Sequence, residues 1–159
     1  NVGAARQSVQ YTKSGDIIYP AGQFIVVYNI EERTQSYYHG HTDRVVCLAI
    51  MPDKSKIHTL VASAQEGRRP KIHVWSVVKK TTEAGLRGIC EAGVSHVAFS
   101  PSGELLAALG SDKLHSLAIY KWRSGELLFS ARNTTQPVHA MSFLGEGTVG
   151  TCGKDHVYF

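Results

Sequence analysis

The amino-acid sequence predicts an all-β fold, namely part of a β-propeller with about three four-stranded blades. Two observations support this prediction. Short runs of β-favouring residues are bounded by turn residues throughout, and no segment of 11 or more residues shows the 3.6-residue apolar period of an amphipathic helix. The strands also recur in self-similar groups, with a period of roughly 40 to 50 residues that is typical of propeller blades.

The strands are predicted from the runs that lie between turn residues. In chain order they span residues 16–19, 24–28, 33–37, 44–51, 59–64, 71–76, 94–100, 105–109, 116–122, 126–131, 138–143, 148–151 and 157–159. Proline and glycine near 51–53 and 100–103 favour tight turns between the first two strands of a blade.

Aromatic residues end four of these strands at a blade-like spacing. Tyr28, Trp75, Tyr120 and Phe159 follow one another at intervals of 47, 45 and 39 residues. We therefore expect a hydrophobic region with a first, incomplete blade at 1–38, one blade at 39–90, a second at 91–133, and the start of a further, truncated blade at 134–159. The remaining blades are expected to come from residues outside this chain.

Composition indicates one globular domain with a sizeable core, since 43% of the 159 residues are hydrophobic and 19% are charged. The apolar runs have strand length, far below the roughly 20 residues that cross a bilayer. No targeting signal follows Asn1, so we expect an internal fragment. Cys47, Cys90 and Cys152 are odd in number and widely spaced, which argues against a disulfide framework or a zinc ribbon and favours a reducing compartment.

The net charge of +4 favours an acidic partner surface. On charge alone, nucleic acid, an anionic membrane and an acidic cytoskeletal polymer all stay open. The densest basic groups are Arg68, Arg69, Lys71, Lys79 and Lys80, for which a solvated loop is the simplest interpretation. Nucleic-acid binding would require aromatic residues interleaved with basic ones on an exposed face. Here the aromatic residues recur at the blade period, so we expect them in packing and expect no nucleic-acid or membrane partner.

Enzyme motifs fail on their context. Residues 145–150 match G-x-G-x-x-G, but a dinucleotide site needs this motif to follow a strand and open a helix, whereas strand and turn are predicted here. The Gly153-Lys154 pair is followed by Asp155 rather than Ser or Thr, so it does not match a phosphate loop.

The eight histidines do not have the spacing of a metal site. His96 and His139 occupy matching positions of successive repeats, which favours a structural role. Ser95 and His96 are adjacent in a predicted strand, so their side chains should point to opposite faces. We expect no catalytic residue, no cofactor and no metal.

Three residues resemble the G-H…W signature of WD repeats. Gly40 and His41 come before one predicted strand, and Trp75 ends another. The resemblance implies that the histidine, a strand hydroxyl, a turn aspartate and the tryptophan form a hydrogen-bonded set, with structural roles for Gly40, His41, Trp75, Asp112, Tyr120 and Asp155. Asp112 and Asp155 stand in the matching turns of later repeats. The Trp75 repeat has Arg69 near that place instead, so this turn is expected to be looser.

A second resemblance covers nearly the whole chain. Residues 9–19 and 24–29 resemble the hydrophobic motif that precedes the WD repeats of echinoderm microtubule-associated protein-like proteins, and residues 37–43, 72–75, 112–116 and 153–156 are similar to the same family repeat after repeat. The arginine-bearing front of that motif is missing or has diverged at residues 1–8.

The family resemblance implies a non-catalytic scaffold that binds tubulin or microtubules, in the cytoplasm or the ciliary axoneme. The alternative is an interaction scaffold, for example in an axonemal assembly, without direct tubulin contact. Arg68, Arg69, Lys71, Lys79 and Lys80 are the candidate partner-binding residues, because they flank the Trp75 strand where loops leave the blade.

Overall fold

The computed structural model describes residues 8–52 and 59–159. The described residues form β-strands and connecting turns, without a helix. These strands and the lack of a helix confirm the all-β prediction for the described residues. The predicted turn at 51–53 lies partly outside the described residues, as does most of the segment 1–8.

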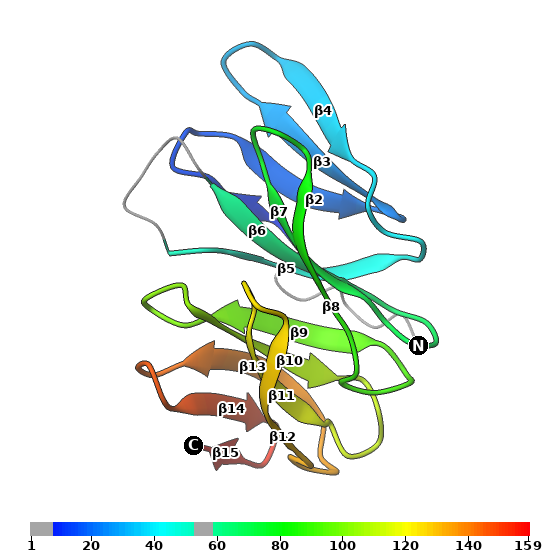
Figure 1. Ribbon diagram of the computed structural model, residues 1–159, viewed down its shortest axis with the longest axis vertical. Coiled ribbons are helices and arrows are strands. Elements are labelled where there is room, and N and C mark those ends of the chain that lie inside the picture. The colour runs from blue at the N-terminus through cyan, green and yellow to red at the C-terminus, as the bar shows by residue number, and fades with distance from the viewer. Residues whose placement is uncertain (1–7, 53–58) are drawn as a thin grey trace.

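Four antiparallel sheets follow one another along the chain (Figure 1). The first sheet holds β1 (Gln10–Tyr11), β2 (Ile17–Ala21), β3 (Phe24–Asn29) and β4 (Thr34–Tyr38). The second holds β5 (Val45–Ile50), β6 (Leu60–Gln65), β7 (Ile72–Ser76) and β8 (Thr82–Leu86). The third holds β9 (Val94–Phe99), β10 (Leu105–Gly110), β11 (Leu117–Lys121) and β12 (Glu126–Ala131), and the last holds β13 (Val138–Phe143), β14 (Val149–Gly153) and β15 (Val157–Tyr158).

Every sheet is a meander in which each strand pairs with its neighbour in sequence. The first strands of successive sheets also contact one another, β5 against β9 and β9 against β13. Sheets that approach through their first strands and diverge toward their last strands have the arrangement of propeller blades. The partial propeller predicted from the period is thus the observed fold, and we call the four sheets blades 1 to 4.

Side chains between adjacent blades form the core in three clusters. The cluster between blades 1 and 2 includes Ile18, Tyr38 and Trp75, which are buried. The largest cluster lies between blades 2 and 3, and a smaller one around Leu109 and Met141 joins blades 3 and 4. Burying such side chains contributes about 1.5 to 3 kcal/mol each, so packing between blades stabilises the array.

Irregularities of the strand pairing recur at matching places. The pairing of the last two strands shifts between Val74 and Trp75 in blade 2 and between Ile119 and Tyr120 in blade 3. Such bulges strengthen the twist of an edge strand. Their recurrence shows that blades 2 and 3 repeat one another in backbone detail.

The register of blade 4 corrects two alignments made from the sequence. His139 lies in the bulge after Val138, as Ser95 lies in the bulge after Val94, so His139 corresponds to Ser95 and not to His96. Tyr158 lies opposite Thr151, as His73 lies opposite Ser63 in blade 2. Phe159, the next residue, therefore corresponds to Val74 and not to Trp75. Its spacing of 39 residues from Tyr120 matched a blade period only because an aromatic residue happens to stand one position early.

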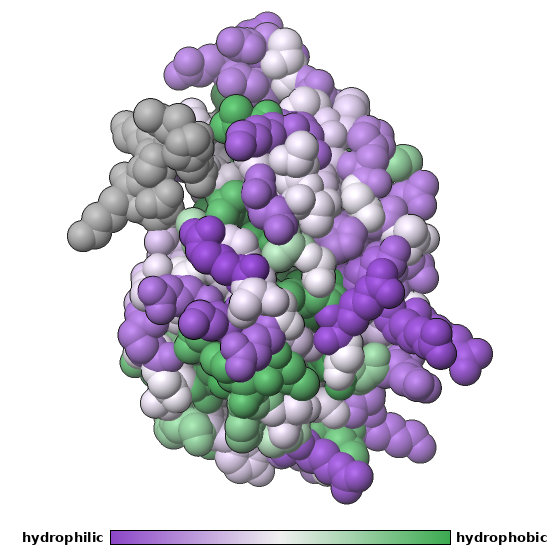
Figure 2. Space-filling view, viewed as in Figure 1, coloured by the Kyte–Doolittle hydropathy of each residue, from purple (hydrophilic) through white to green (hydrophobic). Residues whose placement is uncertain are grey.

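The outer blades expose apolar side chains. On blade 1 the large exposed residues include Tyr11, Phe24 and Tyr37. From β12 onward they include residues 127–129 and 157–159. Figure 2 shows an apolar patch in its lower half, in the region where β11 and β12 lie in Figure 1. The two outer faces of this array are thus only partly covered by its own residues.

Candidate functional site

His41, Ser63 and Trp75 form a buried hydrogen-bonded set in blade 2. The Trp75 indole N–H donates to Ser63 Oγ over 3.1 Å, and Ser63 Oγ lies 2.7 Å from His41 Nε2. His41 Nδ1 lies 3.0 Å from Gln65 Oε1, so the proton of the imidazole belongs on Nδ1. Burial lowers the pKa of His41 to about 4, and the ring is therefore neutral near pH 7.

Gln65 occupies the acceptor position for which the family pattern uses a turn aspartate. Its Oε1 also accepts from the Thr42 amide at 3.3 Å, and its Nε2 donates to Thr42 Oγ1 at 3.3 Å. Arg69, which the sequence placed near that role, is exposed in the β6–β7 turn with a left-handed backbone (φ 54). Gln65 was not predicted for this role because it lies at the end of β6 rather than in the turn.

Four rings join blade 1 to blade 2. Tyr38 stacks on Trp75 with centroids 4.4 Å apart, and His41 stacks on His73 at the same distance. The Tyr38 hydroxyl reaches His73 Nδ1 at 2.9 Å and Thr82 Oγ1 at 2.6 Å. A Cβ at Gly40 would collide with this hydroxyl, so glycine is required there. Gly40, His41 and Trp75 thus meet at one blade junction.

The other predicted structural residues lie apart from this set. In blade 3, Asp112 accepts from the Ser116 amide (3.0 Å) and hydroxyl (2.9 Å), which closes the β10–β11 turn. Burial alone would raise the pKa of Asp112, but the hydrogen bonds from Ser116 and Leu114 lower it. Tyr120 takes the place of Trp75 and donates to the carbonyl of Arg87 at 3.0 Å. Asp155 is exposed in the β14–β15 turn.

The five predicted partner-binding residues do not form one cluster. Arg68, Arg69 and Lys71 lie on the β6–β7 turn, and Lys79 and Lys80 lie on the β7–β8 turn, at the opposite end of β7. We call the end of the blades that carries His41 and the β6–β7 turn the His41 end. The opposite end carries the β7–β8 turn and Ser102 in the β9–β10 turn, and we call it the Ser102 end. Lys80 is half-buried, and its ammonium group donates to the Val77 carbonyl.

Charge is distributed unevenly between the two ends of the described residues. The His41 end carries eight cations against five anions. The cations are Arg44, Arg68, Arg69, Lys71, Arg87, Lys113, Arg132 and Lys154, and the anions are Asp43, Glu66, Glu91, Asp112 and Asp155. The Ser102 end carries six cations against seven anions. The basic character of the described residues therefore belongs to the His41 end.

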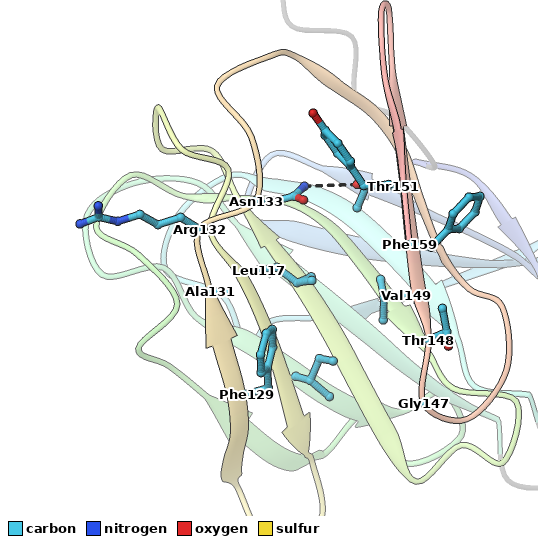
Figure 3. Close-up of a pocket in the computed structure, with 12 residues that line it drawn as sticks. Leu117, Phe129, Ala131, Arg132, Asn133, Gly147, Thr148, Val149, Thr151 and Phe159 are labelled. Carbon is cyan, nitrogen blue, oxygen red and sulfur yellow. Dashed lines mark hydrogen bonds between the residues drawn. The ribbon is translucent and has the colours of Figure 1, made fainter.

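The cavity drawn in Figure 3, with a volume of about 710 Å³, opens between blade 3 and blade 4. Leu117 and Phe129 line it from blade 3, and Val149 and Phe159 from blade 4. Arg132 is the one charged residue among the described residues that line it. The lining is mostly apolar and lacks the converging titratable groups of an active site.

Ser95 and His96 lie closer together than the strand alternation predicted. His96 Nδ1 is 3.1 Å from Ser95 Oγ, beside a bulge at Leu109–Gly110. The earlier expectation of opposite faces was therefore wrong. The Ser95 hydroxyl also donates to the Leu109 carbonyl at 3.1 Å, and His96 Nε2 donates to the His139 carbonyl over 3.3 Å, so both side chains are hydrogen-bonded to the backbone of neighbouring strands.

Three further sequence features bear on nucleotide, metal and membrane binding. Residues 145–150 occupy the β13–β14 turn and the start of β14, not a helix N-terminus. Among the described residues, no group of three or more His, Cys, Asp or Glu side chains lies close enough together to hold a metal ion. The described part of the chain also has no helix long and apolar enough to span a membrane.

Comparison with known proteins agrees with this geometry. Residues 83–114 match the family model "WD domain, G-beta repeat". Echinoderm microtubule-associated protein-like 4 of Xenopus laevis is 36% identical over 97% of this chain and 18% of its own length. The human protein of that name is 36% identical over 97% of this chain and 17% of its length, and human echinoderm microtubule-associated protein-like 1 is 32% identical over 97% and 20%.

The chain belongs to the echinoderm microtubule-associated protein-like family. It spans about a fifth of the length of these curated relatives. A chain in the crystal structure of the mitotic checkpoint complex superposes with a TM-score of 0.72 at 12% identity, over 97% of this chain and 46% of that one. At this identity the likeness shows the WD-repeat propeller fold alone.

Proposed function

We propose that the protein containing this family segment is a non-catalytic scaffold that binds tubulin in microtubules. The similarity to microtubule-associated relatives over 97% of the chain carries the proposal. Loops on a rigid propeller suit docking on a large partner. The proposed location is the microtubule cytoskeleton of the cytoplasm, or of the ciliary axoneme, and no cofactor, nucleic acid or membrane is required.

The excess of cations at the His41 end supports binding to an acidic polymer surface. The predicted residues Arg68, Arg69, Lys71, Lys79 and Lys80 are the first set to test. Reversing their charge should weaken co-sedimentation of the intact protein with polymerised purified tubulin. Raising the salt to physiological strength should weaken it as well, since the Debye length falls to about 8 Å.

The outcomes of this experiment separate the two scaffold functions. Equal pelleting of wild type and variant at every salt concentration would remove the five residues from the interface. No pelleting of either protein with purified tubulin, but pelleting with microtubules assembled in a cell extract, would support the alternative of a scaffold without direct tubulin contact.

A further inference from the structure

Blade 2 gathers four cations at its His41 end. Arg68 and Arg69 occupy the β6–β7 turn, and Lys71 directly precedes β7. Because Ile72 pairs with Leu86, Arg87 follows the paired end of β8 beside Lys71. Burial lowers the pKa of His73 to about 4, and the positive charges of Lys71 and Arg87 lower it further.

These cations are not neutralised within the described residues. The ion pair of the described residues joins Arg44 to Glu66 at 3.9 Å and involves none of the four. Arg68, Arg69 and Arg87 are exposed, and Lys71 is half-buried. Asp43 and Glu66 lie at the same end, with the Asp43 carboxylate beside Gly67, but among the described residues no ion pair joins them to the four cations. An anionic partner would therefore reduce the repulsion among these cations.

The backbone under the cluster is fixed. The Gln65 amide donates to the Lys71 carbonyl at 3.3 Å, and Glu66 bridges to Gly93 of blade 3. The Arg87 carbonyl accepts from the Tyr120 hydroxyl, and Pro70 is buried. The backbone that carries the four cations is therefore held in place, which limits the backbone entropy lost when a partner binds.

We propose that Arg68, Arg69, Lys71 and Arg87 form a docking site for a carboxylate-rich, extended segment of a partner protein. The proposal rests on the scaffold function proposed above and narrows its surface to one end of blade 2. Guanidinium groups pair with carboxylates through two parallel hydrogen bonds, so three exposed arginines favour glutamate and aspartate side chains. Exposed aromatic rings, which a nucleic-acid strand would stack on, lie on blade 1 and from β12 onward rather than in this cluster.

The test uses the intact protein and a fluorescein-labelled peptide in which glutamate alternates with glycine. Fluorescence polarisation compares wild type with the triple variant Arg68→Glu, Arg69→Glu, Arg87→Glu. A matched variant, Lys13→Glu, Arg33→Glu, Lys121→Glu, has the same change of net charge on exposed residues of the Ser102 end. The first variant should weaken binding at least about tenfold. The matched variant should change it less than about threefold.

Equal weakening by both triple variants would overturn the proposal, because it would reduce the effect to net charge. Absence of peptide binding by the wild type would overturn it as well. Tighter binding of a single-stranded oligonucleotide, lost in the same Arg variant, would replace the peptide with nucleic acid. Arg87→Glu alone changes an exposed side chain and should weaken peptide binding several-fold. Microtubule pelleting measured in parallel tests the scaffold function separately, since it can persist when peptide binding is absent.

Discussion

Trp75 concentrates three kinds of interaction in one side chain. It is fully buried, its ring stacks on Tyr38 of blade 1, and its indole N–H bonds to Ser63. Trp75→Ala should therefore lower the stability of the intact protein by about 3 to 5 kcal/mol. Trp75→Phe keeps an aromatic ring and removes the N–H, and should cost about 1 kcal/mol.

Urea denaturation followed by circular dichroism gives both values, and tubulin pelleting gives the effect on binding. The prediction is that folding suffers more than binding, because Trp75 has no exposed surface. Loss of pelleting by Trp75→Ala at unchanged stability would place Trp75 in the binding surface instead.

The stacked histidines predict how stability depends on pH. Burial lowers the pKa of both His41 and His73 to about 4, below the value of about 6.5 of an unfolded chain. The unfolded state thus binds protons first as the pH falls. The contribution of these rings is fully present above about pH 6.5, declines from there to about pH 4, and is then constant.

The loss should be on the order of 3 kcal/mol per histidine. Denaturation midpoints of the intact protein between pH 7 and pH 4 measure it. His73→Gln removes one of the two groups and should reduce the slope of unfolding free energy against pH by about half. A slope equal to that of wild type would show that His73 is not buried as a neutral ring.

At the scale of elements, turns of neighbouring blades are fastened to each other. Glu146 in the β13–β14 turn accepts from the amide and the hydroxyl of Ser102 in the β9–β10 turn, both at 2.6 Å. The Ser102 hydrogen bonds lower the pKa of Glu146. Glu146→Ala should speed hydrogen exchange of residues 144–148 while leaving β9 unchanged. Glu104→Ala, at an exposed glutamate of the β9–β10 turn, is the matched control and should leave the exchange as in wild type.

Which elements could be predicted from the sequence depends on burial. Inner strands such as β6, β7 and β10 are dense in apolar residues, and the sequence located them closely. β8 was missed because Thr-Glu-Ala-Gly-Leu has low strand propensity, and it is held in the sheet by pairing with β7. β1 has only two residues, too few for a pattern.

The site was less predictable than the fold, for a physical reason. Sequence groups residues that are close along the chain, so Arg68, Arg69 and Lys71 were placed with Lys79 and Lys80, although β7 separates the two groups. Arg87 was missed because only strand pairing brings it beside Lys71. In an antiparallel meander, successive turns lie at alternate ends of the sheet. Counting the turns along the chain could therefore have shown that the two basic groups lie at opposite ends of the blade.

At the scale of the whole molecule, the open faces of the outer blades govern the behaviour of this chain by itself. Exposed apolar residues lie on blade 1 and on β12 to β15, where a closed propeller would set another blade against them. Exposed sheet faces and unpaired edge strands favour association. Residues 1–159 expressed alone should therefore self-associate and should unfold without a sharp transition, whereas the intact protein should melt cooperatively.

Sedimentation velocity and calorimetry over a range of protein concentrations test this expectation. Self-association should raise the sedimentation coefficient and shift the unfolding temperature as concentration rises. Substituting Leu128→Lys on the β12 edge, an exposed position where blade 2 has Glu83, should reduce association because a charge opposes edge pairing. A sharp, concentration-independent transition of a monomer would show instead that three inter-blade clusters suffice for a stable fold, and that the exposed apolar faces do not drive association.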